Sequence, residues 1–297
     1  MKSATRNAYA CRIDRALVLV QRAIETGVEL PDLADLAAAA QFSPFHFHRV
    51  YRALTGETIG HTVARLRLLR ALHLLERPDV SVTEIAMAIG YETPQAFARA
   101  FRAEFGATPT GLRSQPERLA QGREALSRPL AADPTAPSAL QVRVVSVEPF
   151  EVVALRNHGD YADLDQVYGR LFAWAADVGL VERIAGLYGL PWQDRRDAPA
   201  AHYEFDCAVR IAVRTDPPAP LRMLALGGGE HARMRHVGSF DGLEDACDRL
   251  LAHWLPDSGY ELRDIPIHHH YLDDPDETPE AMLRTDIYVP VRRAVAS

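Results

Sequence analysis

The sequence predicts a multidomain protein: an all-α domain with two helix-turn-helix units, followed by an α+β domain of two pseudo-symmetric strand-helix-strand-strand repeats. Three observations predict this fold class. Residues 44–56 and 94–106 resemble each other at an offset of 50, a segment containing several prolines follows, and a second repeat with an offset of 79 or 80 fills most of the remainder. We therefore place the helical domain at 8–120, a linker at 121–140 and the α+β domain at 141–293.

The repeat in the helical half is dense for its length. The segments PFHFHRVYRALTG and PQAFARAFRAEFG share proline, phenylalanine, two arginines, alanine and glycine at equal positions, and Asp35-Leu36-Ala37 matches Glu84-Ile85-Ala86 just upstream. Segments with the same pattern of helix starts, apolar spacing and stops are expected to fold alike. The repeat therefore predicts two copies of one helix-turn-helix unit.

The helix boundaries of the second unit can be predicted residue by residue. Ser81 and Glu84 have the spacing of a capping box, which opens a helix that Gly90 ends in the left-handed conformation. Thr93 is placed to cap the next helix, with Pro94 as its first residue. Between the two units, residues 60–77 read as one long helix that stops before Pro78.

The second helix of each unit carries side chains suited to reading DNA. Such a helix enters the major groove, where Gln pairs with adenine and Arg with guanine. Off the apolar stripe lie Gln95, Ala96, Arg99 and Arg102 in the second unit, and Phe45, His48, Arg49 and Arg52 in the first. We assign Phe47 and Phe97 to the core. The alternative is that these arginines are only solvated charges on the surface. The presence of the same pattern in both repeats favours the DNA-reading interpretation.

The charge of the chain is unevenly distributed. The formal net charge is −7, but residues 1–128 carry 17 basic and 13 acidic residues, and residues 129–297 carry 16 basic and 27 acidic residues. The halves therefore have net charges of +4 and −11, which indicates two different tasks. Because +4 is modest, contact with phosphates must depend on where individual arginines lie.

Residues 30–116, and above all SVTEIAMAIGYETPQAFARAFRAEFGATPTGLR at 81–113, resemble the DNA-binding domain of AraC/XylS-family transcription regulators. The resemblance implies seven helices, with two helix-turn-helix units joined by a long helix. It also implies sequence-specific binding of double-stranded DNA near promoters, often with recruitment of RNA polymerase. The base-reading positions of the family correspond here to Pro44, Phe45, His48, Arg49, Gln95, Ala96 and Arg99.

The acidic half contains its own repeat. RNHGDYADL at 156–164 matches RHVGSFDGL at 235–243, and Pro199, Asp206 and Val209 match Pro279, Asp286 and Val289. Each copy reads as strand, helix, strand, strand. Two copies related by a pseudo-dyad would join edge to edge into a curved sheet with helices on one face. A groove on the dyad is then the expected place for a ligand.

Aromatic side chains are concentrated in the acidic half, which contains all three tryptophans of the chain. Aromatic surfaces bind flat apolar compounds and organic cations. The candidate ligand-binding residues are Trp174, Tyr188, Trp192, Tyr203, Trp254, His269, Tyr271 and Tyr288. The competing interpretation is that Trp174 and Trp254 are ordinary core residues of amphipathic helices.

Residues 141–293 resemble the GyrI-like (Rob-type) effector-binding domain, through the NHGDY and HVGSF turns and the segment YLDDPDETPEAMLRTDIYVPV. The resemblance implies binding of hydrophobic, often cationic, small molecules in a central groove. Many members have a Glu two residues before the tyrosine that corresponds to Tyr271, whereas this chain has His269. A neutral aromatic ligand, or an anionic one if His269 is protonated, becomes an alternative.

Other site classes are not expected. His268, His269 and His270 alternate between the two faces of a strand, so we expect no metal site, and no motif indicates a cofactor or catalytic group. Three separated cysteines form no disulfide framework, and no apolar run has the length of a membrane span. We expect a cytoplasmic, ligand-responsive transcription regulator that is not an enzyme. The alternatives for the acidic domain are a protein-interaction or sequestering module and a small-molecule hydrolase.

Overall fold

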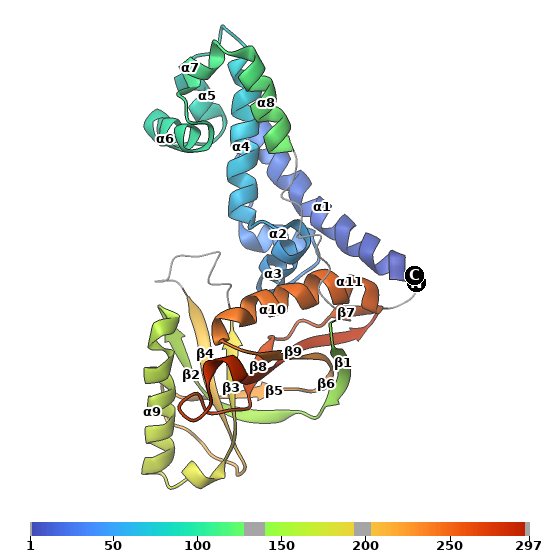
Figure 1. The fold of residues 1–297 in the computed structure, drawn as a ribbon, viewed down its shortest axis with the longest axis vertical. Coiled ribbons are helices and arrows are strands. Elements are labelled where there is room, and N and C mark those ends of the chain that lie inside the picture. Colours follow the sequence, from blue (N-terminus) through green and yellow to red (C-terminus); the bar gives the residue numbers. More distant parts are fainter. Residues whose placement is uncertain (1, 128–139, 193–202, 295–297) are drawn as a thin grey trace. The chain divides into compact units, whose positions relative to one another are not determined.

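The computed structural model describes residues 2–127, 140–192 and 203–294. Two compact units divide the chain, with most of residues 9–134 in one and residues 135–297 in the other. In the described residues the first is helical and the second is built on a β-sheet (Figure 1). The predicted fold class, a helix-turn-helix region followed by an α+β domain, is confirmed.

The described residues of the helical unit form eight helices. They are α1 (Lys2–Thr26), α2 (Leu33–Ala39), α3 (Pro44–Thr55), α4 (Ile59–Leu75), α5 (Val82–Ala88), α6 (Pro94–Phe105), α7 (Pro109–Arg113) and α8 (Pro116–Ser127). The long connecting helix predicted at 60–77 is α4. Helix α8 extends into the segment 121–140 that the sequence assigned to a linker, and positions 128–139 lie outside the described residues.

The second helix-turn-helix unit consists of α5 and α6. The Ser81 side chain accepts a hydrogen bond from the Glu84 backbone, and the Glu84 carboxylate accepts one of 2.8 Å from the Ser81 N–H. Gly90 has a φ of +80° and turns the chain toward the Thr93 cap. The predicted capping box, stop and cap are therefore confirmed. Helix α2 opens with an equivalent capping box, formed by Asp32 and Asp35.

The two helices of this unit are held by a shared apolar core. Phe97 and Phe101 of α6 are fully buried together with Leu72 of α4 and Ile85 of α5. Burying a large apolar side chain contributes roughly 1.5–3 kcal/mol, so these contacts fix the orientation of α6. The assignment of Phe47 and Phe97 to the core is confirmed, because both have an exposed fraction of 0%.

The second unit contains a nine-stranded antiparallel sheet. Its elements are β1 (Val142–Val147), β2 (Phe150–His158), α9 (Leu164–Asp177), β3 (Ile184–Pro191), β4 (Glu204–Ile211), β5 (Arg222–Leu226), β6 (Gly229–Val237), α10 (Leu243–Arg249), α11 (Leu255–Ser258), β7 (Tyr260–Leu262), β8 (His268–Tyr271) and β9 (Arg284–Arg293). A π-helical segment, Leu250–Trp254, joins α10 to α11.

The order of the strands shows the internal symmetry. It is β1-β6-β9-β8-β3-β4-β2-β5, with β7 added beside β9. The sequence offset of 79 or 80 makes β1, β2, β3 and β4 equivalent to β5, β6, β8 and β9. The order therefore reads as the same four strands outward from a central pair, β8 and β3. The copies join edge to edge through this pair, as predicted.

Each copy contains one strand more than the sequence repeat suggested. The strands β1 and β5 precede the matching segments, and each pairs with the second strand of the other copy: β1 with β6 and β5 with β2. The two strands have dissimilar sequences, VRVVSV and RMLAL, so the repeat could not be detected there. This exchange of edge strands ties the two copies together at both ends of the sheet.

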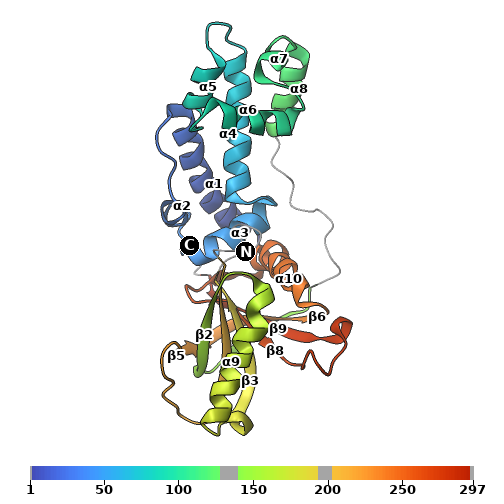
Figure 2. The ribbon, with the colours of Figure 1, turned by 90° about the vertical axis from the view of Figure 1, so that its left-hand side faces the viewer.

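Helix α9 packs against β2 and β4 (Figure 2). Val167 and Leu171 of the helix are buried against Leu155, Cys207 and Val209 of the sheet. Alternation along a strand assigns Phe205 and Cys207 to this helix-facing side and Asp206 to the other side. Among the described residues, no helix is both long and apolar enough to cross a membrane.

Candidate DNA interface and ligand pocket

Helix α6 presents its predicted reading residues on one face. Gln95, Arg99 and Arg102 are exposed and Ala96 is half-buried, while the opposite stripe is buried. Spacings of three and four residues bring these side chains onto one side of the helix. The Thr93 cap and the aromatic core hold the first turns of α6 in place. Helix α6 therefore exposes a polar face that carries the predicted base-reading residues.

Helix α3 carries the equivalent positions of the first unit. Pro44 is its first residue, and Phe45, His48, Arg49 and Arg52 follow at helical spacing on the same helix. The helix ends at Gly56, which has a φ of +76°, as α6 ends at Gly106 with +63°. Helices α3 and α6 therefore begin with proline and are followed by glycine at equivalent positions.

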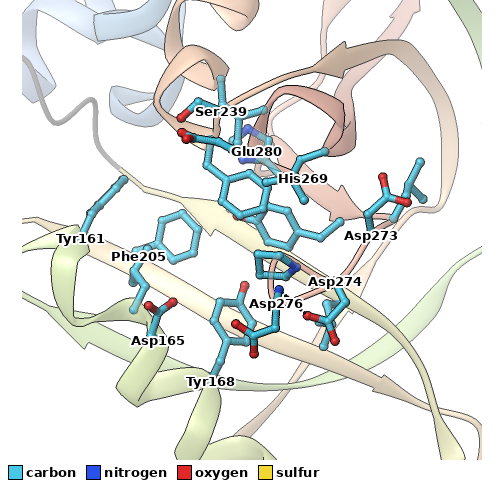
Figure 3. Close-up of a pocket in the computed structure, with 18 of the residues that line it drawn as sticks. Tyr161, Asp165, Tyr168, Phe205, Ser239, His269, Asp273, Asp274, Asp276 and Glu280 are labelled. Atoms are coloured by element: carbon cyan, nitrogen blue, oxygen red, sulfur yellow. Dashed lines mark hydrogen bonds between the residues drawn. The ribbon is translucent and has the colours of Figure 1, made fainter. Parts of the chain in front are cut away.

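A cavity of about 1030 Å³ lies on the helix-facing side of the central strands. Its walls come from the starts of α9 and α10, from β3, β4 and β8, and from the loop between β8 and β9 (Figure 3). Its size is at the upper end of the range for small-molecule sites. The groove that the sequence placed on the pseudo-dyad corresponds to this cavity in position.

Matching residues of the two repeats line the cavity in pairs. At an offset of 79, Tyr161 corresponds to Phe240, Leu164 to Leu243 and Asp165 to Glu244, and all six are lining residues. The sequence analysis did not select them, although they lie in or beside the two matching turns. The repeat itself was the available signal, because residues related by a dyad must approach each other where the dyad meets the groove.

Six phenylalanine and tyrosine side chains line the cavity. Tyr161 contacts Phe205 edge to face, with centroids 5.1 Å apart, and Tyr271 contacts Phe240 at 5.1 Å and Tyr168 at 6.3 Å. Burial raises the pKa of both Tyr168 and Tyr271 well above the usual value for tyrosine. The two phenols are therefore uncharged at neutral pH.

His269 is a buried polar residue that lines the cavity. Its exposed fraction is 3%, and its neighbour on β9 is Ile287. Burial lowers the pKa of His269 to about 3, so the imidazole is neutral near pH 7. This argues against the alternative in which a protonated His269 binds an anion.

Carboxylates gather at the mouth. Asp274, Asp276 and Glu280 are exposed, and Asp273 is bound by Arg284 at 2.6 Å. This ion pair lowers the pKa of Asp273. The cavity therefore combines an aromatic interior with an acidic rim on the β8–β9 loop.

Of the eight predicted ligand-binding residues, the cavity brings together His269 and Tyr271. Three others take part in aromatic or polar contacts elsewhere in this unit. Trp174 packs on the α9 core, the Trp192 indole donates a hydrogen bond of 2.6 Å to Asp206, and Trp254 stacks on Tyr260.

The remaining three candidates are Tyr188, Tyr203 and Tyr288. Tyr188 stacks on His270 and Tyr288 on His268, with ring centroids 4.5 and 4.9 Å apart. Tyr203 lies beside the cavity, where its ring is 5.6 Å from that of Tyr161.

The three consecutive histidines alternate as the strand period predicts. His268 and His270 contact tyrosines on one face of the sheet, and His269 lines the cavity on the other. Burial lowers the pKa of His268 to about 3 and also lowers that of His270. Within the described ranges, no three His, Cys, Asp or Glu side chains are grouped to hold a metal ion.

Comparison with known proteins gives two family matches. Residues 140–292 match the family described as the GyrI-like small molecule binding domain, and residues 36–115 match the family described as a helix-turn-helix domain. The first match covers more than half of the chain. The two matches fall on the sheet unit and on the two helix-turn-helix units.

Two curated relatives and one solved structure illustrate the likeness. The chain is 27% identical over 158 residues to the probable transcriptional regulator YgiV of Escherichia coli K12, covering 51% of this chain and 96% of that protein. It is 27% identical over 281 residues to the right origin-binding protein of the same strain, covering 88% and 92%. The cryo-EM structure of an EcmrR–DNA complex covers 89% of this chain and 100% of that chain, with 14% identity and a TM-score of 0.43.

Proposed function

Because this chain belongs to the family of the GyrI-like small-molecule-binding domain and also carries an AraC-type helix-turn-helix domain, we propose that it is a transcription regulator whose output is set by a small hydrophobic or aromatic ligand. The helical domain binds promoter DNA through α3 and α6. The ligand occupies the cavity between α9 and α10. RNA polymerase is the partner through which occupancy of the promoter changes transcription.

The observation that carries the ligand proposal is the cavity on the pseudo-dyad. It has a volume of about 1030 Å³ and aromatic walls, and it contains one buried, neutral imidazole. A concave site of this size that combines apolar and aromatic side chains with polar groups is typical of small-molecule sites. The name of one relative supports the proposed regulatory function, since YgiV is described as a probable transcriptional regulator.

The DNA part of the proposal relies on the reading face of α6. Gln95 and Arg99 are exposed one turn apart, which suits bidentate contacts to adenine and guanine. A ligand changes the output only if it binds two functional states with different affinity. We propose that the cavity supplies this difference.

A pocket-filling variant tests the proposal. Leu164 lines the cavity and is half-buried, so Leu164→Trp is expected to fill part of the cavity and leave α6 unchanged. A reporter under a promoter that the protein occupies would be screened with aromatic compounds in both proteins. We expect equal promoter occupancy and a response confined to the wild type. A response that persists in Leu164→Trp would contradict the proposed site.

A further inference from the structure

His269 has no hydrogen-bond partner in the described part of the chain. Both ring nitrogens, Nδ1 and Nε2, are buried and unpaired, and the side chain is 3% exposed. Buried polar atoms in proteins are almost always hydrogen-bonded, and leaving one without a partner is unfavourable. Two such atoms on one ring that lines a cavity indicate a place where a bound molecule completes the structure.

His269 lies on β8, one of the two central strands of the sheet. It pairs with Gly189 at the junction of the two repeats, so no side chain of β3 lies opposite it. A Cβ on Gly189 would lie 2.5 Å from both Phe205 Cζ and Tyr271 Oη. The absence of a side chain therefore keeps open the space that these rings occupy around His269.

The cavity offers a ligand two different kinds of polar group. The acidic rim formed by Asp274, Asp276 and Glu280 favours a cation at neutral pH. His269 offers hydrogen bonds in place of charge, because a neutral imidazole provides one N–H donor and one acceptor. A quaternary ammonium group can satisfy neither nitrogen, and a carboxylate can accept only from the N–H and is repelled by the acidic rim.

We propose that the cavity binds an uncharged aromatic compound with a hydroxyl group, and that this hydroxyl hydrogen-bonds to His269. A hydroxyl both donates and accepts, so it can meet either nitrogen in either tautomer. The rest of the compound contacts aromatic side chains that line the cavity: Tyr161 and Phe205, which meet edge to face, and Tyr271, which meets Phe240 edge to face. The inference rests on the proposed ligand-binding function and names the class of its ligand.

The test uses the full chain and three probes in isothermal titration calorimetry. 4-Hydroxybiphenyl carries the hydroxyl, biphenyl has the same rings without it, and tetraphenylphosphonium is an aromatic cation. The variants are His269→Phe, which keeps a flat ring without hydrogen bonding, and His269→Gln, which keeps a donor and an acceptor. Circular dichroism checks that each variant is folded.

We expect the wild type to prefer 4-hydroxybiphenyl to both other probes. His269→Phe should weaken 4-hydroxybiphenyl by about tenfold, the scale of one buried hydrogen bond, and change biphenyl little. His269→Gln should restore most of the loss. If His269→Phe does not fold, the preference of the wild type and the affinity of His269→Gln still decide the question.

Three outcomes would overturn the inference. A wild-type preference for tetraphenylphosphonium would assign the cavity to cations, and equal losses for both biphenyls in His269→Phe would remove the hydrogen bond from the argument. Both results would leave the proposed function intact. No saturable binding of any probe would contradict the ligand-binding function as well as this inference.

Discussion

Gly189 on β3 and His269 on β8 lie opposite each other at the centre of the sheet. They are 80 residues apart and occupy equivalent positions in the two repeats, so the pseudo-dyad passes between them. One member of the pair has no side chain and the other lines the cavity. The symmetry of the fold is therefore broken where the ligand is proposed to bind.

This pair predicts a strong effect of a single methyl group. In Gly189→Ala the new Cβ would lie 2.5 Å from Phe205 Cζ and from Tyr271 Oη, so both rings must move. We expect at least a tenfold loss of affinity for an aromatic probe, because the two rings that line the cavity would be displaced. The control is Gly60→Ala on α4, which does not line the cavity and where the atom nearest to the added Cβ is Thr58 Oγ1, at an ordinary contact distance of 3.7 Å. Equal affinity of the two variants would contradict the prediction.

Arg99 should contribute to DNA selectivity. Sites selected from a random library by the wild type would be compared with those bound by Arg99→Ala. Loss of a bidentate guanine contact should cost about 1–3 kcal/mol and relax the base preference at one position. Arg22→Ala, an exposed arginine of α1 outside both helix-turn-helix units, is the matched control. Unchanged selectivity in Arg99→Ala would remove this residue from the reading set.

Asp206 should be a major determinant of the stability of the sheet unit. Its carboxylate is fully buried and accepts hydrogen bonds from Arg156, Arg222 and Trp192 at 2.5–2.6 Å. Asp206→Asn removes the charge from a buried network and should lower the free energy of unfolding by about 3 kcal/mol. Glu261→Gln, in a partly exposed pair with Arg292, should change it by under about 1 kcal/mol. Urea unfolding followed by circular dichroism measures both.

Acid should destabilise the sheet unit through its buried histidines. Burial lowers the pKa of His268 and of His269 to about 3 in the folded state, against about 6.5 in the unfolded chain. Between these values only the unfolded state takes up the protons. The stability is therefore present above about pH 6.5 and is lost as the pH falls toward 3.

The pH effect can be measured by tryptophan fluorescence, because all three tryptophans belong to residues 141–293. Each histidine should change the free energy of unfolding by up to about 1.4 kcal/mol per pH unit. Urea midpoints at pH 7.5 and pH 5.5 test this, and His268→Phe should reduce the difference. If the urea midpoint is not lower at pH 5.5 than at pH 7.5, the histidines take up protons in the folded state as readily as in the unfolded chain, which would contradict the prediction.

Local chemistry made much of the helical domain predictable. The capping box at Ser81 and Glu84, the cap at Thr93 and the stop at Gly90 involve residues that are neighbours in the sequence. Their geometry depends on hydrogen bonds within one or two turns. The burial of Phe97 followed from helical spacing alone, because the same stripe recurs in the first repeat.

The lining of the cavity was less predictable. The aromatic composition pointed to Trp174, Trp192 and Trp254, which the structure places in packing and hydrogen-bonding contacts. The lining residues Tyr161 and Phe240 instead lie in the two matching turns. Composition shows which side chains are present, and it carries no information about which of them face one another.

The sequence by itself determined the two domains, the repeat in each and the alternation of the three histidines, since these depend on spacing along the chain. Only the tertiary structure decided that β1 and β5 exchange between the copies and that His269 meets Gly189 beside a cavity. Strand pairing brings together residues that are far apart in the sequence, and its register fixes which side chains share a face. The neutral state of His269 has the same origin, because its burial depends on contacts that only the folded sheet creates.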